Sequence, residues 1–140
     1  MVLSFQNLEH PQIALDNAKK HLKQGGTLIL VLNHPCFRIP RQSSWGIDED
    51  KKIQFRRVDT YLSTQKIPID IHPGKKNPVT TFSFHHSLSS IFSMLEASGF
   101  TVSSLIESPS DKVSTGKNAK MENKARDEIP LFMTLVAKSL

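Results

Sequence analysis

The sequence predicts one α/β domain, and three features of its first third support that prediction. Residues 11–23 have a helical period, Gly25-Gly26 ends it, and the run 27–32 is almost entirely apolar. An apolar run after a helix and a tight turn is typical of a strand buried on both faces of a parallel sheet. Such a sheet needs several more strands than follow here, so we expect part of a larger α/β domain.

Composition limits the class of protein. The chain has 140 residues, of which 38% are hydrophobic, and this is enough for one domain with its own core. No apolar run approaches the ~20 residues that a membrane span requires. Met1-Val2-Leu3 lacks the basic start of a secretory signal, and Cys36 is the single cysteine. We therefore expect a cytoplasmic protein with no disulfide bond and no membrane partner.

The net charge of +5 raises the question of a nucleic-acid partner. Basic residues are densest over 112–126, where acidic neighbours dilute them and no aromatic residue is interleaved. A nucleic-acid-binding face needs a basic stripe or interleaved aromatic side chains. The pattern favours a solvated loop, and we expect no nucleic-acid partner.

The first elements follow from local signals. The apolar stretch 1–5 predicts a strand, and a helix is expected over about 11–23, with Pro11 in its first turn. Gly25 can adopt the left-handed conformation that stops a helix. The core face of this helix is predicted to carry Ala14, Leu15, Ala18 and Leu22.

The middle of the chain predicts a small antiparallel insertion. Prolines and serines break any period over 33–45, so a loop is expected there. A strand is predicted over 53–58, and two more over 67–71 and 79–84 are separated by the turn signal at 73–78. We assign residues 46–85 to the insertion.

The last third returns to the α/β pattern. Ser87 is a suitable N-cap for a second helix that Gly99 closes. Strands are predicted over 100–106 and 129–137, and the polar stretch 109–128 between them is expected to be a mobile loop. The core face of the second helix is predicted to carry Leu88, Ile91, Phe92 and Leu95.

Several short segments add a family resemblance to this pattern. Residues 22–28 read L-K-Q-G-G-T-L and residues 33–40 read N-H-P-C-F-R-I-P. Further segments are S-S-W-G at 43–46, R-V-D-T-Y-L at 57–62, H-P-G at 72–74, T-F-S-F-H at 81–85 and E-I-P-L-F at 128–132. With the order of elements, they resemble the C-terminal half of class I S-adenosylmethionine-dependent methyltransferases. Within that family they are most similar to a bacterial subgroup with N-H-P-C-F-R-x-P after this strand. The resemblance covers essentially the whole chain.

The resemblance implies a partial Rossmann-like sheet and S-adenosylmethionine as cofactor. Members of the family carry upstream a G-x-G-x-G loop that approaches the cofactor and an acidic residue that holds its ribose. No G-x-G occurs among the glycines of this chain, which are Gly25, Gly26, Gly46, Gly74, Gly99 and Gly116. We therefore expect weak cofactor binding by the chain alone. We also expect either a complementary N-terminal half or a homo-oligomer that covers the edge of the first strand.

The resemblance also implies the cofactor-binding residues. Ser4, Phe5, Gln6 and Asn7 would lie where the fourth strand ends beside the methyl-bearing sulfonium. Short polar side chains there can position a nucleophile, and Phe5 can pack on the cofactor. A strand end with a loop leading into the helix accounts for the same residues equally well.

His34 is the candidate catalytic residue. It follows the strand 27–32, and the ends of strands are where open α/β sheets bind ligands. Methyl transfer requires an aligned acceptor and, where needed, removal of its proton, for which a histidine has a suitable pKa. The alternative is a loop histidine that bonds to backbone.

Asn33, Arg38, Tyr61 and His85 are the candidate substrate-binding residues. Arg38 and Tyr61 could contact an anionic or planar acceptor, although a salt bridge would explain Arg38 as well. The histidines have no ligand-like spacing to Cys, Asp or Glu, so no metal site is expected.

Two functions remain in competition, and nucleic-acid binding through the basic stretch 112–126 is a third, weaker alternative. The first is a methyltransferase-like protein for an unidentified small molecule, incomplete without its cofactor-binding half. The second is a non-enzymatic interaction module derived from a methyltransferase, which pairs with its own copy or with a partner.

Overall fold

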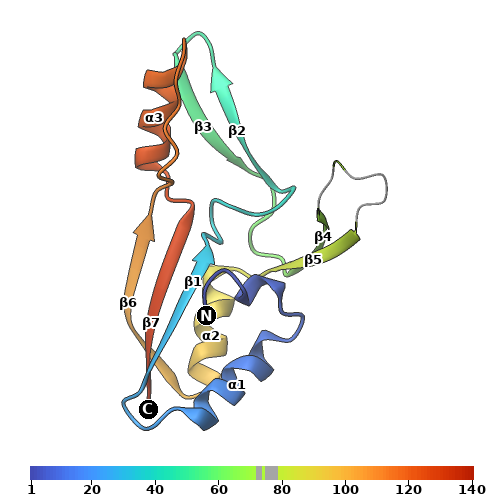
Figure 1. The fold of residues 1–140 in the computed structure, drawn as a ribbon, viewed down its shortest axis with the longest axis vertical. Coiled ribbons are helices and arrows are strands. Elements are labelled where there is room, and N and C mark those ends of the chain that lie inside the picture. The colour runs from blue at the N-terminus through green and yellow to red at the C-terminus, as the bar shows by residue number, and fades with distance from the viewer. Residues whose placement is uncertain (72–73, 75–78) are drawn as a thin grey trace.

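The computed structural model describes residues 1–71, 74 and 79–140, and it divides into a body and an arm (Figure 1). The body is a three-stranded sheet with two helices packed on it. The arm, at the upper end of Figure 1, consists of the hairpin β2–β3 and the helix α3. A second hairpin, β4–β5, projects from the side of the body.

The sheet of the body confirms three predicted strands and shows how they pair. Its order is β1 (Thr27–Asn33), β7 (Phe132–Ser139) and β6 (Phe100–Ser108), and each neighbouring pair is antiparallel. Among the described residues, the only parallel pairing outside the named strands is the single bridge between Val2 and Val31. The family-like α/β architecture with antiparallel insertions is therefore present. The parallel part of the expected sheet is reduced to that bridge.

The predicted strand over residues 1–5 is wrong beyond its first residues. The backbone of Met1 and Leu3 hydrogen-bonds to β1, since Leu3 donates to Val31 at 2.7 Å and Val31 donates to Met1 at 2.9 Å. The chain then turns into the short 3-10 helix η1 (Phe5–Asn7). This turn brings Phe5, which is 2% exposed, into the core.

In the described part of the chain, helices cover one face of the sheet and leave the other exposed, which differs from the burial of β1 on both faces that the sequence predicts. Helices α1 (Pro11–His21) and α2 (Leu88–Ala97) lie on the face that carries Leu30, and that side chain is fully buried. On the opposite face Ile29 is 49% exposed and Ile106 is 51% exposed. The core contains Phe5, Leu15, Leu28, Leu30, Leu32, Ile91, Leu95, Phe100, Met133, Leu135 and Ala137.

The double glycine forms the turn that the sequence predicts. Gly25 has φ +75°, the left-handed conformation that favours glycine, and its N–H donates to the Ser139 carbonyl at 2.8 Å. A Cβ on Gly26 would lie 2.7 Å from the Lys23 carbonyl oxygen. The two positions therefore require glycine for different structural reasons, and together they form the turn that connects α1 to β1.

The second helix matches its predicted start and most of its predicted core face. The Ser87 side chain accepts from the Ser90 N–H, as an N-cap does. Ile91 and Leu95 are buried, whereas Phe92 is 36% exposed and points away from the core.

The insertion consists of two separate hairpins. In the first, β2 (Ser43–Asp48) pairs with β3 (Ile53–Val58). In the second, β4 (Gln65–Ile71) pairs with β5 (Val79–His85). The predicted turn at 73–78 lies outside the described residues except for Gly74. The expected loop 33–45 ends earlier than predicted because β2 begins at Ser43.

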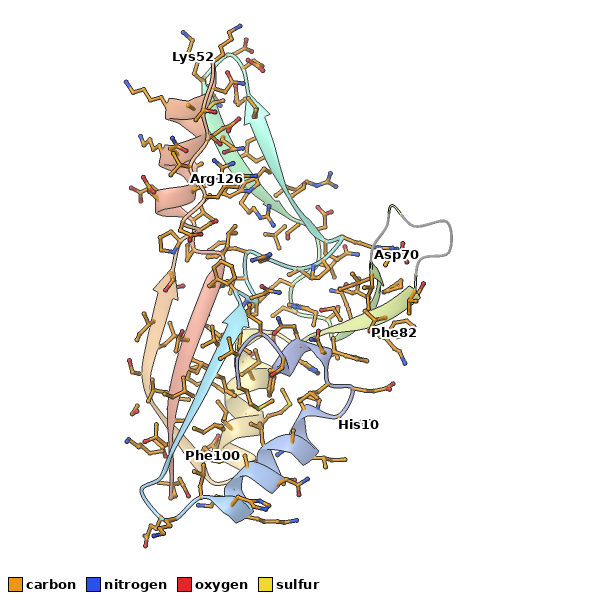
Figure 2. The ribbon with its side chains drawn as sticks, viewed as in Figure 1. His10, Lys52, Asp70, Phe82, Phe100 and Arg126 are labelled. Atoms are coloured by element: carbon orange, nitrogen blue, oxygen red, sulfur yellow. The ribbon has the colours of Figure 1, made fainter. Side chains whose placement is uncertain are left out.

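The stretch 109–128 differs from the predicted loop, because it contains the helix α3 (Ala119–Glu128). Alanine, lysine, methionine, glutamate and arginine have high helix propensity, so the segment is helical despite its few apolar residues. Asn123 holds the preceding loop by accepting from the Ser114 N–H at 2.8 Å and donating to its carbonyl at 3.2 Å. Arg126 adds a hydrogen bond to the Ser114 hydroxyl, and Figure 2 shows it in the arm with Lys52.

Strand β6 contains a bulge that changes which residues share a face. Val102 lies opposite Ala137, but Ser104 lies opposite Val136, so Ser103 is an extra residue. As a result, Glu107 lies opposite the buried Met133. Without the extra residue, Ile106 would occupy that place.

None of the helices in the described part of the chain is long and apolar enough to cross a membrane.

Candidate functional site

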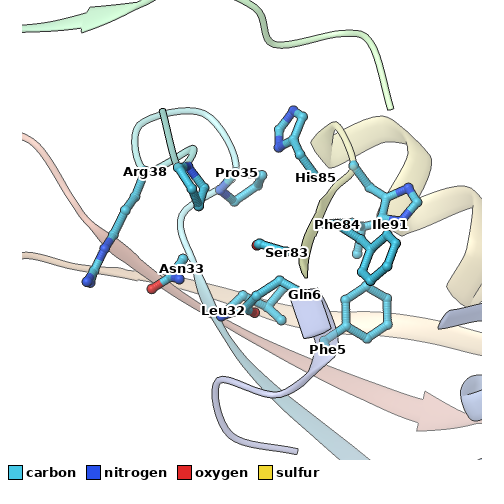
Figure 3. Close-up of a pocket in the computed structure, with 12 residues that line it drawn as sticks. Phe5, Gln6, Leu32, Asn33, Pro35, Arg38, Ser83, Phe84, His85 and Ile91 are labelled. Carbon is cyan, nitrogen blue, oxygen red and sulfur yellow. The ribbon is translucent and has the colours of Figure 1, made fainter. Parts of the chain in front are cut away.

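A small pocket lies where β1 ends, between η1, the end of β5 and the start of α2 (Figure 3). Its volume is about 30 Å³, which is room for one or two water molecules rather than for a whole substrate. It is lined by Phe5, Gln6, Leu32, Asn33, Pro35, Arg38, Pro40, Ser83, Phe84, His85, His86 and Ile91. The pocket thus combines three segments that are far apart in sequence.

Two polar atoms in this lining are buried and lack hydrogen-bond partners among the described residues. They are Oε1 of Gln6 and Nε2 of His86. A buried polar group without a partner costs about 1–3 kcal/mol, so such groups are rare unless water or a ligand satisfies them. Gln6 offers an acceptor, and His86 offers a ring nitrogen. The pocket is therefore suited to a polar group of a bound molecule.

His85 is buried at the rim of the pocket and is held by Tyr61. Its Nε2 donates to the Tyr61 carbonyl at 2.6 Å, which leaves Nδ1 as the acceptor nitrogen of the neutral ring. The Tyr61 hydroxyl accepts from the Leu88 N–H at 2.9 Å, so the same tyrosine fixes the start of α2. Burial and a contact with the Cys36 thiol raise the pKa of Tyr61, which keeps its hydroxyl protonated.

Burial keeps both neighbouring histidines neutral near pH 7. It lowers the pKa of His85, although the bond to the Tyr61 carbonyl acts in the opposite direction. Burial also lowers the pKa of His86, and the nearby His85 lowers it further. A neutral imidazole can accept a proton, so either ring is chemically competent as a base.

His34 does not line this pocket. Its Nδ1 accepts from the Cys36 N–H at 3.1 Å, and its Nε2 donates to Oε1 of Glu107 at 2.7 Å. The ring is 2% exposed. These bonds clamp the end of β1 to β6 across β7. His34 as the catalytic base stays a prediction, and its hydrogen bonds also give it a structural role.

The predicted cofactor-binding residues occupy different environments. Phe5 and Gln6 line the pocket, and Phe5 is also part of the core. Ser4 precedes η1 without a side-chain cap bond, and Asn7 is exposed, with its Nδ2 3.5 Å from the Leu3 carbonyl oxygen. The structure thus brings two of the four to the pocket.

Of the predicted substrate-binding residues, Asn33, Arg38 and His85 line the pocket. Tyr61 lies behind His85, and their ring centroids are 6.0 Å apart. The pocket lining also includes His86 and Ser83, which are not among the predicted binding residues. The alternation of β5 and the short loop to Ser87 could have indicated them. Sequence reasoning also missed Glu107, because the bulge in β6 has no clear sequence signal.

A larger cavity lies in the arm, between the β2–β3 turn and α3. Its volume is about 720 Å³, and its lining is mostly lysine and polar: Glu49, Lys52, Lys117, Asn118, Lys120, Met121 and Lys124. This lining contains no histidine, tyrosine or cysteine, and none of the candidate site residues that the sequence predicts. We therefore place the candidate site at the end of β1.

No metal centre is evident in residues 1–71, 74 and 79–140, since no three or more His, Cys, Asp or Glu side chains converge there.

The fold is shared with known structures. No protein-family model matches the chain, and no curated protein matches it. A solved S-adenosylmethionine-dependent methyltransferase from Mesorhizobium loti superposes with a TM-score of 0.68 at 18% identity, over 98% of this chain and 58% of that one. A Listeria monocytogenes protein assigned to the same class has a TM-score of 0.72 at 19% identity, over 99% and 59%. The glycopeptide N-methyltransferase MtfA, solved with S-adenosyl-L-methionine, has a TM-score of 0.50 at 17% identity, over 99% and 55%.

These likenesses show the class of fold. Essentially the whole chain has a methyltransferase-like α/β fold, and the resemblance in its short segments agrees with this. The chain spans less than two thirds of the length of these structures, from 55% to 59%.

Proposed function

We propose that the chain forms the acceptor side of an S-adenosylmethionine-dependent methyltransferase that acts on a small molecule. The observation that carries this proposal is the pocket at the end of β1. It holds two unpartnered polar atoms, of Gln6 and His86, in a chain whose fold matches methyltransferases over 98–99% of its length. In open α/β sheets, ligands bind beyond strand ends of this kind.

The lining residues fit the chemistry of the cofactor. When bound, S-adenosylmethionine supplies an activated methyl group on a sulfonium. Gln6 has a free buried acceptor for an N–H of the cofactor, and Phe5 gives an apolar wall. Ser4 and Asn7 would complete the approach from η1. We assign these four residues to the cofactor side.

The acceptor would bind on the other side of the pocket. Asn33 and Arg38 come from the end of β1, and His85 is oriented by Tyr61. These side chains would align the reacting atom, and a histidine would take its proton where the acceptor has one to lose. His34 is the predicted base. His85 and His86 are the alternatives, since both are neutral and close to the pocket.

A complementary polypeptide segment is part of the proposal. The chain contains no G-x-G sequence, and the structures it matches are longer. Charge-assisted hydrogen bonds from such a loop and from a ribose-binding carboxylate contribute about 1.5–3 kcal/mol each. Without two or three of them, binding would weaken by orders of magnitude. We therefore propose that this chain alone binds the cofactor weakly or not at all.

Calorimetry with S-adenosylmethionine tests this directly. The chain is measured alone and fused to the part of the Listeria protein that it does not match. We expect micromolar binding only in the fusion, with a fusion altered in its glycine loop as the control. A low-micromolar dissociation constant for the chain alone would contradict the need for a complementary segment. A folded fusion that does not bind would contradict the methyltransferase assignment.

Substitution in an active fusion then separates the histidines. His34→Ala should lower kcat by about 100-fold or more if His34 is the base, with little change in cofactor affinity. The matched variants are His85→Gln and His86→Gln. If turnover survives in His34→Ala and is lost in one of the others, that histidine is the base and His34 is structural.

A second candidate function rests on the uncovered sheet face. Val2, Ile29 and Ile106 are 69%, 49% and 51% exposed, and exposed apolar surface on a sheet favours association. In this alternative the chain is an interaction module that pairs with its own copy. Light scattering would then give a dimer or larger oligomer. A stable monomer at tens of micromolar would exclude ordinary self-association.

A further inference from the structure

Two arginines lie at the loop that follows β1, in different environments. Arg56, on β3, is half-buried, and its Nε donates to the Phe37 carbonyl at 2.7 Å. Its Nη2 donates to the Ser43 hydroxyl at 2.9 Å, and the guanidinium lies 5.1 Å from the centroid of the Trp45 ring. These contacts fix Arg56 in one place beneath the loop that follows β1.

Arg38 belongs to that same loop and is exposed at the mouth of the pocket. Its guanidinium carbon lies 4.8 Å from the centroid of the Phe132 ring, which supports it from one side. Among the described residues its side-chain N–H groups have no hydrogen-bond partner. Figure 3 shows the side chains of Arg38 and Asn33 extending toward the same side of the pocket.

Neither guanidinium pairs with a carboxylate in the described part of the chain. The five ion pairs found there join His34 to Glu107, Lys51 to Asp48, Arg57 to Asp59, Lys66 to Glu9 and Arg126 to Glu122. Partly buried charges usually have an opposite charge beside them. Burial lowers the pKa of Arg56, and the charge of Arg38 lowers it further. The fold therefore holds two positive charges near each other without a counter-charge.

An oxyanion fits this arrangement better than a neutral group does. A guanidinium presents a planar fork that binds carboxylate or phosphate through two parallel hydrogen bonds. Arg38 has this fork free, and the fixed charge of Arg56 adds attraction without any rearrangement. Asn33 lies at the same rim and can add a side-chain amide donor.

We propose that Arg38, supported by Arg56, binds an oxyanion group, a carboxylate or a phosphate, of the methyl acceptor. The statement that the anion belongs to the methyl acceptor rests on the proposed function. The anion site itself needs no cofactor. The methylated atom would then lie within one small molecule's length of this anion, toward His85 and His86.

Nuclear magnetic resonance on the isotopically labelled chain tests the site. The Nε–H signals of the arginines are followed while sodium acetate or sodium phosphate replaces sodium chloride at constant ionic strength. We expect a saturable shift of the Arg38 signal with at least one anion. The anion that binds with the higher affinity identifies the group as a carboxylate or a phosphate. A third titration uses S-adenosyl-L-homocysteine.

Three variants decide whether Arg38 is responsible. Arg38→Gln should weaken anion binding by about tenfold or more, which is the loss expected for a charge-assisted hydrogen bond. Arg38→Lys should retain part of it. The control is Arg57→Gln, on β3 beside Arg56, whose partner is Asp59 at 2.6 Å, and it should leave anion binding unchanged. The backbone spectrum of each variant verifies its fold.

Each outcome bears on the proposal. The absence of a saturable shift with both anions overturns it, and so does equal affinity in Arg38→Gln. If S-adenosyl-L-homocysteine shifts Arg38 at lower concentration than acetate and phosphate do, the site holds the cofactor's carboxylate and the acceptor assignment is wrong. If the anion binds as expected while the fusion binds no S-adenosylmethionine, the anion site stands and the methyltransferase proposal fails.

Discussion

The hydrogen bond between His34 and Glu107 predicts a measurable loss of stability on substitution. The Cys36 N–H donates to Nδ1, so Nε2 carries the hydrogen that Glu107 accepts at 2.7 Å. The ring is 2% exposed, and a buried donor left without a partner costs about 1–3 kcal/mol. The Glu107 side chain is 51% exposed, so water can replace part of the bond. We expect Glu107→Ala to lower the free energy of unfolding by about 1–2 kcal/mol.

Urea unfolding followed by circular dichroism measures this change. Glu96→Ala, at an exposed position of α2, is the control and should change stability by no more than about 0.5 kcal/mol. In a His34→Ala background, Glu107→Ala should cost no more than the control does, because the donor is already gone. Equal effects of the two glutamate variants in the unaltered chain would refute the clamp. An undiminished cost in the His34→Ala background would refute it as well.

The remaining predictions concern glycines and pH. Gly26→Ala places a Cβ 2.7 Å from a backbone carbonyl oxygen and should cost about 1–3 kcal/mol in urea unfolding. Gly46→Ala places its Cβ 2.4 Å from the Phe55 ring, which is 45% exposed and can swing outward. Gly46→Ala should therefore lower the free energy of unfolding by less than Gly26→Ala does. A larger loss for Gly46→Ala would contradict the packing. Burial lowers the pKa of His85 and of His86 below 6.5 in the folded chain. As the pH falls, these histidines therefore bind protons in the unfolded chain before they do so in the folded one. The free energy of unfolding should thus decrease as the pH drops below about 6.5. Replacing both histidines with glutamine should flatten this dependence, and an unchanged slope would show that other groups cause it.

Local signals predicted most of the elements. The period of α1, the glycine at its end and the apolar run of β1 are short-range features, and each appears in the structure where the sequence places it. Ser87 as an N-cap is another. These predictions succeed because a few neighbouring residues determine the backbone conformation.

The predictions that were wrong concern features that depend on long-range contacts. The apolar run 27–32 does not reveal whether a second layer covers the strand, so Ile29 was expected to be buried. The helix α3 depends on contacts with β3 and with Ser114, which the polar composition of 109–128 does not indicate. The partner of His34 depends on the extra residue in β6, and a simple alternation from Phe100 would have placed Ile106 there.

For the candidate site, the sequence located the right strand end but not the orientation of its side chains. Asn33, Arg38 and His85 were expected near one another and do line one pocket. His34, next to Asn33, faces the other way because neighbouring residues of an extended chain point to opposite sides. Only the fold shows which of two adjacent polar residues reaches a ligand.

The placement of the arm has a consequence for how this protein can diversify. The connections between the sheet and the arm leave from one end of the sheet: β1 leads into β2, β6 leads into α3, and α3 leads back into β7. The turn at Gly25-Gly26 lies at the opposite end. Insertions or deletions within the arm therefore leave the pairing of β1, β7 and β6 unchanged. Descendants of this chain could alter the surroundings of the pocket by changing loop length alone, while the sheet that supports it stays the same.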